Sequence, residues 1–455
     1  MKRIVNYVAA VAILFTTTCS LAAEFSLPEY QKISLKNGLT LYLMEQHEVP
    51  LIDVLVTVKA GAVQDELAGQ AMLTADSLLL GTTKLSKPEF EQKMDFVGGQ
   101  ISSGANLEYS YIKLSMAKVD QDSLLPLLRD AIVAPAFEQA EFDKHLTRYQ
   151  AQLEQQKESP RQVIKSYFNE LIYAGHPYAS RVEGTAESVA AIKLATVKSF
   201  HNKWYQPNNS AIVITGDFDS KKMKAKIEKL FSGWKGQAAK FNLSLALPSP
   251  EEAKVLLVNK SDANESTFMI GGPGIKRSNP DYVALSVINT VLGARFTSWL
   301  NDELRVNSGL TYGAGSRFDS HMAGGSFYIS TFTKTASTNE AMDLALSTYA
   351  RLWEKGIDDA TLASAKAYVK GLFPPKYETS EDLAWLLSDM FVYGFNEDFI
   401  NNFSEQVNSL DLSRSKQLID TYFPKDKLQF VVVGKADDIR DKLQKYGKLS
   451  ETQIK

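Results

Sequence analysis

The feature that most limits the fold of this chain is an order of elements that occurs twice. The apolar run "AMLTADSLLLG" at 71–81 has a counterpart in "VALSVINTVLG" at 283–293, and both end in Leu-Gly, a common helix stop. A β-rich stretch precedes each run, at 51–62 and at 267–275. Two further pairs follow in the same order, offset by about 210–220 residues: 158–175 with 378–394, and 210–219 with 428–436. Four pairs in register predict two homologous domains.

The length and composition agree with this interpretation. A chain of 455 residues is too long for one ordinary domain, and 44% apolar residues are enough for two cores. Period-2 strands alternate with long helical stretches such as 138–158 and 338–355, which predicts an α+β class. We expect the domains at 24–236 and 254–455. The segment 237–253 contains prolines and no helical period, so we expect it to be the linker.

The N-terminus is typical of a secretory signal peptide at 1–23. Lys2 and Arg3 precede the apolar run "VAAVAILF", and the small residues of "CSLAA" follow, so we expect cleavage after Ala22 or Ala23. A transmembrane anchor is the alternative, but the run is shorter than the ~20 residues that a span requires. Cys19 is the only cysteine, so the mature chain has no disulfide and depends on packing. The sequence therefore predicts a periplasmic protein without a membrane span after signal removal.

The net charge of −3 gives no indication of nucleic-acid or anionic-membrane binding. Four segments indicate a family instead: "VEGTAESVAAI", "WYQPNNSAIVITGDF", "NTVLGARFTSWLNDELRVNSGLTYGAGS" and "VVVGKADDI". With these landmarks in order, the chain resembles the pitrilysin/insulinase-type (M16) zinc metallopeptidases, in particular the short two-domain branch similar to the mitochondrial processing peptidase. The resemblance covers nearly the whole mature chain. It implies two domains, each a mostly antiparallel sheet with helices on one face, that form a bowl-like half chamber.

The active members of this family carry H-x-x-E-H on their first long helix. Its histidines bind one Zn²⁺, its glutamate activates the metal-bound water, and a later carboxylate completes the ligands. Aligning this pattern on the chain places Met72 and Asp76 at the histidine positions and Ala75 at the general-base position. The later carboxylate falls at Gln152, with Glu154 as a possible substitute. We therefore expect no metal in this chain.

The remaining histidines offer no replacement for that motif. No two of the five are spaced i, i+3 or i, i+4, so none forms a helical zinc pair, and we expect surface or hydrogen-bonded roles for them: His47, His145, His176, His201 and His321. The matching helix of the second half carries Ala284, Val287 and Ile288, which cannot bind zinc either.

One half of the family's site is still present. In the family, an Arg and a Tyr of the C-terminal domain reach the zinc site and bind the substrate backbone and the developing oxyanion. The resemblance assigns these roles to Arg305 and Tyr312. Arginine presents a fixed charged fork and tyrosine a neutral donor, which suits both tasks. The alternative is that Arg305 pairs with Glu303 and that Tyr312 only packs in a strand.

This asymmetry favours a non-catalytic subunit of a heterodimeric zinc peptidase. The partner would be an M16 subunit with an intact H-x-x-E-H that holds the zinc, and the substrates would be peptides. Two alternatives stay open: a stand-alone peptide- or protein-binding module that uses the same chamber, and a self-sufficient enzyme with an unfamiliar site.

Overall fold

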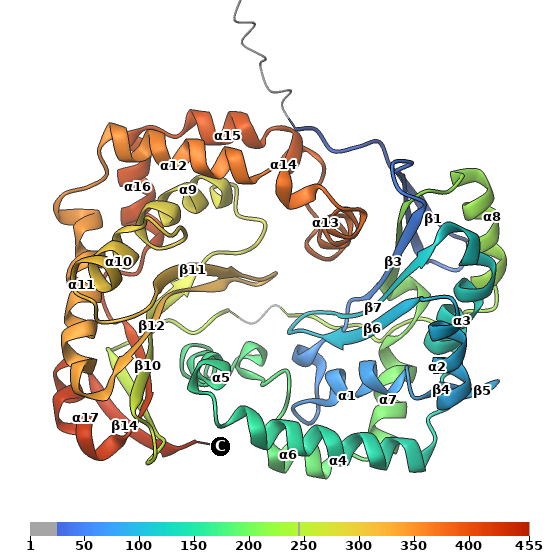
Figure 1. Ribbon diagram of the computed structural model, residues 1–455, viewed down its shortest axis with the longest axis horizontal. Helices are drawn as coiled ribbons and strands as arrows, with labels where there is room; N and C mark the ends of the chain where they lie inside the picture. Colours follow the sequence, from blue (N-terminus) through green and yellow to red (C-terminus); the bar gives the residue numbers. More distant parts are fainter. Residues whose placement is uncertain (1–24, 244–245, 455) are drawn as a thin grey trace, which may run out of the picture.

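The computed structural model describes residues 25–243 and 246–454, so the predicted signal peptide at 1–23 lies outside the described residues. Two six-stranded sheets form the two halves of the molecule (Figure 1). The order of the first is β1-β2-β8-β3-β7-β6, with strands at Gln31–Ser34, Thr40–Glu45, Ser210–Gly216, Leu51–Val58, Ser110–Ala117 and Gln100–Ala105. The order of the second is β14-β9-β13-β10-β12-β11, with strands at Lys448–Gln453, Lys254–Asn259, Gln429–Gly434, Glu265–Gly274, Gly325–Lys334 and Ala314–Ser320.

The strand directions repeat as well as the order. In the first sheet β2 runs parallel to β8, and the pairs β8–β3, β3–β7 and β7–β6 are antiparallel. In the second sheet β9 runs parallel to β13, and β13–β10, β10–β12 and β12–β11 are antiparallel. Only the added edge strand differs, because β1 is antiparallel to β2 whereas β14 is parallel to β9. The internal repeat is therefore a repeat of topology.

In both halves most helices lie between the strands in sequence. The helices of the first half are α1 (Gln70–Ser77), α2 (Lys87–Phe96), α3 (Gln121–Val133), α4 (Gln139–Gln156), α5 (Pro160–Ile172), α6 (Ala186–Ala191), α7 (Leu194–Trp204) and α8 (Ser220–Phe231). A short hairpin of β4 (Gly81–Thr82) and β5 (Leu85–Ser86) follows α1. The second half contains α9 (Tyr282–Leu292), α10 (Trp299–Asn301), α11 (Thr338–Glu354), α12 (Asp359–Leu372), α13 (Ser380–Tyr393), α14 (Asp398–Asn401), α15 (Phe403–Ser409), α16 (Leu412–Tyr422) and α17 (Ala436–Leu443). In each half one helix follows the strand that is parallel to its neighbour, α8 after β8 and α17 after β13.

The alternation of side chains along β2 and β8 shows that both faces of the first sheet are covered. Leu41, Leu43, Ile212 and Ile214 join the core formed with helices of the first half, including α3 and α8. The alternate residues of the same strands, such as Tyr42 and Val213, join a different core that contains residues of the second half. Since successive strand side chains point to opposite faces, two separate layers pack on this sheet.

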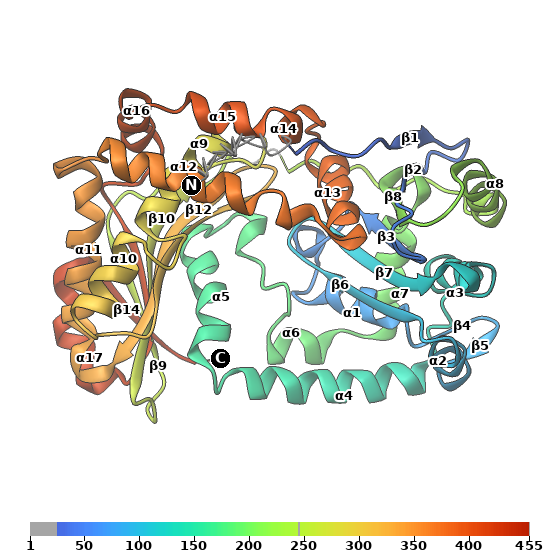
Figure 2. The same ribbon diagram turned by 45° about the horizontal axis from the view of Figure 1, so that its top comes forward.

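On each sheet, the second layer is a helix that comes from the other half of the chain. Helix α13 of the second half packs on β3 and β8 of the first sheet, and α5 of the first half packs on β10 and β13 of the second (Figures 1 and 2). At the first contact Thr57 and Ser388 share a buried hydrogen bond of 2.6 Å between their hydroxyl groups. The expectation of helices on one face holds for each half's own helices, and the exchanged helix covers the other face.

The segment between the halves has no helix or strand in its described residues, and β9 begins at Lys254. Across residues 25–243 and 246–454, every helix is too short or too polar to cross a bilayer.

Candidate functional site

Helix α1 occupies the place where the family motif is expected, and its N-terminus is fixed by backbone geometry and one carboxylate. Gly69, the residue before the helix, has a φ of +93°, and a Cβ there would lie 3.1 Å from the backbone of Glu183 and Gly184. The Asp65 carboxylate accepts hydrogen bonds from the N–H groups of Gly69 at 3.0 Å and Ala71 at 2.8 Å. These bonds satisfy donors that a helix start leaves free.

Asp65 also gives the fold a pH dependence. Burial raises the pKa of Asp65 from 3.8 to about 8, against the opposing effect of the N–H donors. The folded chain therefore holds this proton more tightly than the unfolded chain does. The contribution of Asp65 to the free energy of unfolding is complete below about pH 4 and falls as the pH rises towards about 8.

An Asp65→Asn variant, which cannot ionise, should lack this slope. We expect the free energy of unfolding of wild type, measured by urea denaturation, to fall relative to the variant between pH 5 and pH 8. Glu66→Gln removes an exposed neighbouring charge and should leave the slope unchanged. Parallel stability curves for wild type and Asp65→Asn would contradict the assignment.

The positions of α1 that would carry zinc chemistry are used for packing. Ala75 is completely buried. Met72 is partly buried and packs against two apolar clusters, one under the first sheet and one that contains Leu73, Phe142 and Leu153. A thioether and a methyl group in these places contribute to the core, and neither is a general base.

Asp76 makes the polar contact that links α1 to α4. Its Oδ2 lies 3.1 Å from Nε2 of His145, and the two side chains are 22% and 20% exposed. The family resemblance implies zinc ligands on both helices in active members, whereas here a carboxylate–imidazole hydrogen bond joins them. Sequence reasoning gave His145 no specific role, although it lies seven residues, about two helical turns, before Gln152 on α4.

The residues present do not fit a zinc ion. Gln152 and Glu154 are exposed, and Glu154 pairs with Lys157 at 2.7 Å. Within the described residues, no group of three or more His, Cys, Asp or Glu side chains is placed to hold a metal ion. A structural or catalytic zinc site needs at least three such ligands, so no step of a reaction is assigned to a metal in this chain.

Arg305 and Tyr312 lie in the second half, around a short π-helix at Asp302–Asn307 that precedes β11. Tyr312 is 84% exposed, and its ring lies near that of Phe332, with centroids 6.5 Å apart. The Arg305 guanidinium lies over the Phe296 ring, 4.4 Å from its centroid. Glu303, the alternative partner of Arg305, instead pairs with Arg351 at 2.9 Å. The side chains of Arg305 and Tyr312 are therefore free of ion pairs and hydrogen bonds within the described residues.

The structure places the two sets of predicted residues in different halves. Met72, Ala75, Asp76 and Gln152 belong to α1 and α4, whereas Arg305 and Tyr312 lie beside α10 and β11 (Figure 1). Among the described residues, no hydrogen bond or ion pair joins one set to the other. A cavity of about 420 Å³ opens beside Tyr312, lined by Phe296, Phe332 and Arg161 among others.

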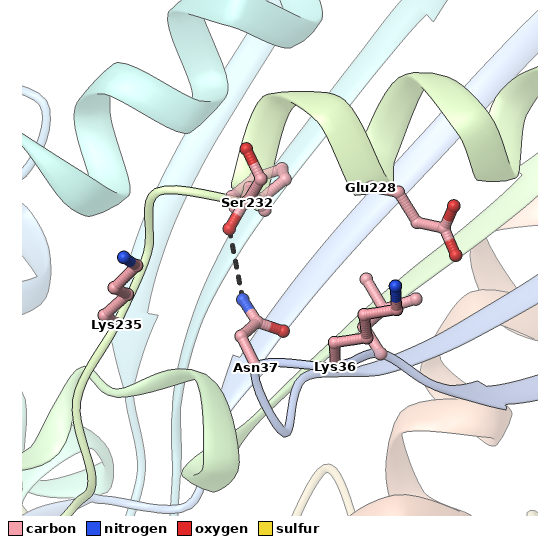
Figure 3. A pocket seen from close by; sticks show the side chains of 7 residues that line it. Lys36, Asn37, Glu228, Ser232 and Lys235 are labelled. Atoms are coloured by element: carbon pink, nitrogen blue, oxygen red, sulfur yellow. Dashed lines mark hydrogen bonds between the residues drawn. The ribbon is translucent and has the colours of Figure 1, made fainter.

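A further cavity, of about 550 Å³, lies on the outer side of the first half between the β1–β2 turn and the end of α8 (Figure 3). Asn37 crosses it and donates hydrogen bonds to the carbonyl groups of Phe231 at 3.1 Å and Trp234 at 3.0 Å. Lys36, Glu228 and Lys235 surround it. Because Asn37 anchors a turn there, we assign this cavity a structural role.

Two family models match the chain in succession. A model described as Insulinase (Peptidase family M16) matches residues 42–186, and one described as Peptidase M16 inactive domain matches residues 191–369. The chain belongs to the M16 peptidase family. The resemblance inferred from the landmark segments is thereby confirmed.

The relatives of this M16 chain include proteins with and without peptidase names. "Zinc protease PqqE" of Helicobacter pylori is 25% identical over 90% of this chain and 94% of the relative. "Non-peptidase homolog YmxG" of the same organism is 24% identical over 86% of this chain and 90% of the relative. Because the two identities are nearly equal, overall similarity does not decide whether this chain is a peptidase.

Solved structures of M16 proteins share the fold. The peptidase M16 inactive domain from Pseudomonas fluorescens superposes with a TM-score of 0.84 at 25% identity, over 90% of this chain and 98% of that chain. A protease from Helicobacter pylori gives a TM-score of 0.82 at 22% identity, over 90% and 100%. The predicted α+β fold with two similar domains is confirmed.

Proposed function

We propose that this chain is a non-catalytic subunit of a heterodimeric zinc peptidase, to which it supplies Arg305 and Tyr312. The observation that carries the proposal is the asymmetry between the two sets of residues. The frame of α1 is kept while its ligand positions hold Met72, Ala75 and Asp76, and Tyr312 stands exposed without a polar partner among the described residues. An exposed tyrosine of this kind is available to a substrate bound in a partner's site.

The roles of the two side chains follow from their chemistry. The Tyr312 hydroxyl would donate a hydrogen bond to the oxyanion that forms when water attacks a peptide carbonyl. The Arg305 guanidinium would bind backbone carbonyl groups of the substrate and add positive charge. The partner would be an M16 subunit with an intact H-x-x-E-H that holds the zinc.

We also propose that the chain acts in the periplasm, on the basis of the signal-like residues 1–23. Purification of a tagged chain from its host, followed by mass spectrometry of what accompanies it, tests both proposals. Recovery of an H-x-x-E-H subunit from the periplasmic fraction supports them. Recovery of the chain alone, or from the cytoplasm, contradicts the heterodimer or the location respectively.

The purified chain should contain far less than one zinc ion and should not hydrolyse peptides without a partner. The reason is that the described residues of α1 and α4 bring together only two potential ligands, Asp76 and His145, where at least three are needed. Zinc is measured by atomic emission after dialysis, with an H-x-x-E-H relative such as an active M16 protease as the positive control. Chelator-sensitive hydrolysis by the isolated chain would favour a self-sufficient enzyme.

The second candidate function is a stand-alone peptide- or protein-binding module. The observation that favours it is a polar cavity of about 590 Å³ between the two halves, which needs no partner to form. Tight peptide binding by a chain that purifies alone would favour this candidate.

A further inference from the structure

The cavity between the halves is built by elements that the helix exchange brings together. It measures about 590 Å³, and its lining comes from the turn between β6 and β7, from α5 and the segment after it, from the segment before α9, from the end of β11 and from α13. Four cations and three carboxylates face it, namely Lys165, Arg181, Arg277 and Arg317 with Glu183, Asp319 and Asp389. Ion pairs within the protein neutralise some of these charges.

Two of the cations have protein partners. Lys165 pairs with Asp319 across the boundary between the halves, with Nζ and Oδ2 2.5 Å apart. Arg181 forms a two-point pair with Glu170 and stacks on the Tyr167 ring. These pairs hold the walls of the cavity together and leave little charge for a ligand.

Among the described residues, no carboxylate forms an ion pair or hydrogen bond with the Arg277 side chain. Three aromatic rings hold its guanidinium, with centroids 4.3, 4.5 and 4.7 Å away: Tyr282, Phe395 and Phe399. Its backbone N–H donates to the carbonyl of His321 at 2.9 Å, which fixes the start of the side chain. One guanidinium nitrogen, Nη1, is buried without a hydrogen-bond partner. The aromatic rings position the charge but do not neutralise it.

Arg317 is the second free cation. It lies on β11, is exposed, and has no ion pair or side-chain hydrogen bond among the described residues. Desolvation and the charges of Arg277 and Arg317 lower the pKa of Lys376, against the opposing effect of the Asp389 and Asp382 carboxylates. Burial raises the pKa of Asp389, the carboxylate on the same side, and the charges of Arg277 and Lys376 oppose that rise, so three cations face this one lining carboxylate. This side of the cavity therefore has an excess of positive charge.

We propose that Arg277 and Arg317 bind a carboxylate of a peptide that occupies the cavity. The inference rests on the proposed function, in which the chamber receives peptides, and adds that acidic peptides or free C-termini are preferred. A carboxylate is the ligand that matches a guanidinium best, because two parallel N–H donors meet its two oxygens. Arg277, held by three aromatic rings, and Arg317, exposed on the edge strand β11, would provide the two contacts.

The test measures peptide binding by the isolated chain, using fluorescence anisotropy of a labelled decapeptide. Four versions of the peptide are compared: an acidic side chain and free C-terminus, the same peptide amidated, the same peptide with Glu replaced by Gln, and both changes together. Losing the carboxylate that is bound should weaken binding about tenfold or more. Loss on amidation identifies the C-terminus as the ligand, and loss on Glu→Gln identifies the side chain.

Substitutions in the chain complete the test. Arg317→Gln should abolish the preference for the acidic peptide and leave folding intact, since the side chain is exposed. Arg277→Gln should do the same, with circular dichroism to exclude unfolding around the aromatic rings. Lys235→Gln removes a cation beside the outer cavity and should change nothing (Figure 3).

Equal affinity for all four peptides, or an unchanged preference in Arg317→Gln, would overturn the proposal, and so would the absence of any peptide binding. These outcomes are separate from the fate of the proposed function. The proposed function is tested by the kinetics of the mixed complex with an amidated neutral peptide, whose cleavage needs no carboxylate site.

Discussion

A Tyr312→Phe variant, assembled with a zinc-bearing M16 subunit, should cleave peptides with a kcat about 10²–10³-fold below wild type. The change removes one hydroxyl from a side chain that is 84% exposed, so folding and assembly should be unaffected. If the hydroxyl donates to an oxyanion only in the transition state, kcat falls while KM stays close to its original value. Steady-state kinetics of the reconstituted complex, together with gel filtration, measure both.

The matched control is Tyr368→Phe, which removes a hydroxyl from another exposed tyrosine, on α12. Its kcat should equal that of wild type. Arg305→Ala should raise KM as well as lower kcat, because it removes a charge that binds the substrate before the reaction. Normal cleavage by complexes that contain either Tyr312→Phe or Arg305→Ala would mean that these residues are only structural.

The second large effect concerns the exchanged helix. Leu387→Ala on α13 should lower the free energy of unfolding by about 2–5 kcal/mol, since Leu387 is completely buried and its removal leaves a cavity. Leu387 belongs to the cluster that joins second-half residues to Tyr42 and Val213 of the first sheet. We therefore expect both halves to lose stability together, in one urea transition that shifts as a whole.

Leu372→Ala is the control for this measurement. Leu372 ends α12 and is 52% exposed, so its truncation should change stability by less than about 0.5 kcal/mol. Tryptophans in both halves, such as Trp204 and Trp353, report the unfolding of each half. If Leu387→Ala shifted the transition of the second half alone, the cluster would not couple the two halves.

Much of the fold could be predicted from the sequence because each member of the repeat has a short local pattern of apolar residues. The paired apolar runs at 71–81 and 283–293 lie on helices that extend from Gln70 to Ser77 and from Tyr282 to Leu292. Each follows a strand that pairs with equivalent neighbours in its own sheet. The resemblance to a family was strong because landmarks spread along the chain occurred in order.

The exchange of α5 and α13 could not be predicted in the same way. The strand Ser210–Gly216 is buried at every position, and a continuous apolar run does indicate a strand covered on both faces. The run does not say which helix covers the second face, since that depends on contacts between distant residues, such as Thr215 and Ser380, which are 165 positions apart. Local periodicity carries no information about partners at that distance.

The candidate site shows the same limit. Family landmarks placed Met72, Ala75 and Asp76 on a helix, but they gave no reason to pair Asp76 with His145. The sequence also did not predict the surroundings of the Arg277 charge, because its three aromatic neighbours come from two segments more than 100 residues apart. Charges become interpretable only when their partners, or the lack of them among the described residues, are known.

The reciprocal packing of α5 and α13 has the form of a self-complementary interface, in which each half lends the same kind of helix to the other. Two separate copies of a half would make such contacts as a symmetric dimer, and dilution would dissociate them. Joining the halves in one polypeptide turns that association into an intramolecular step, which does not depend on protein concentration. The cavity between the halves therefore persists at any dilution, and only the encounter with a second subunit responds to the amount of protein present.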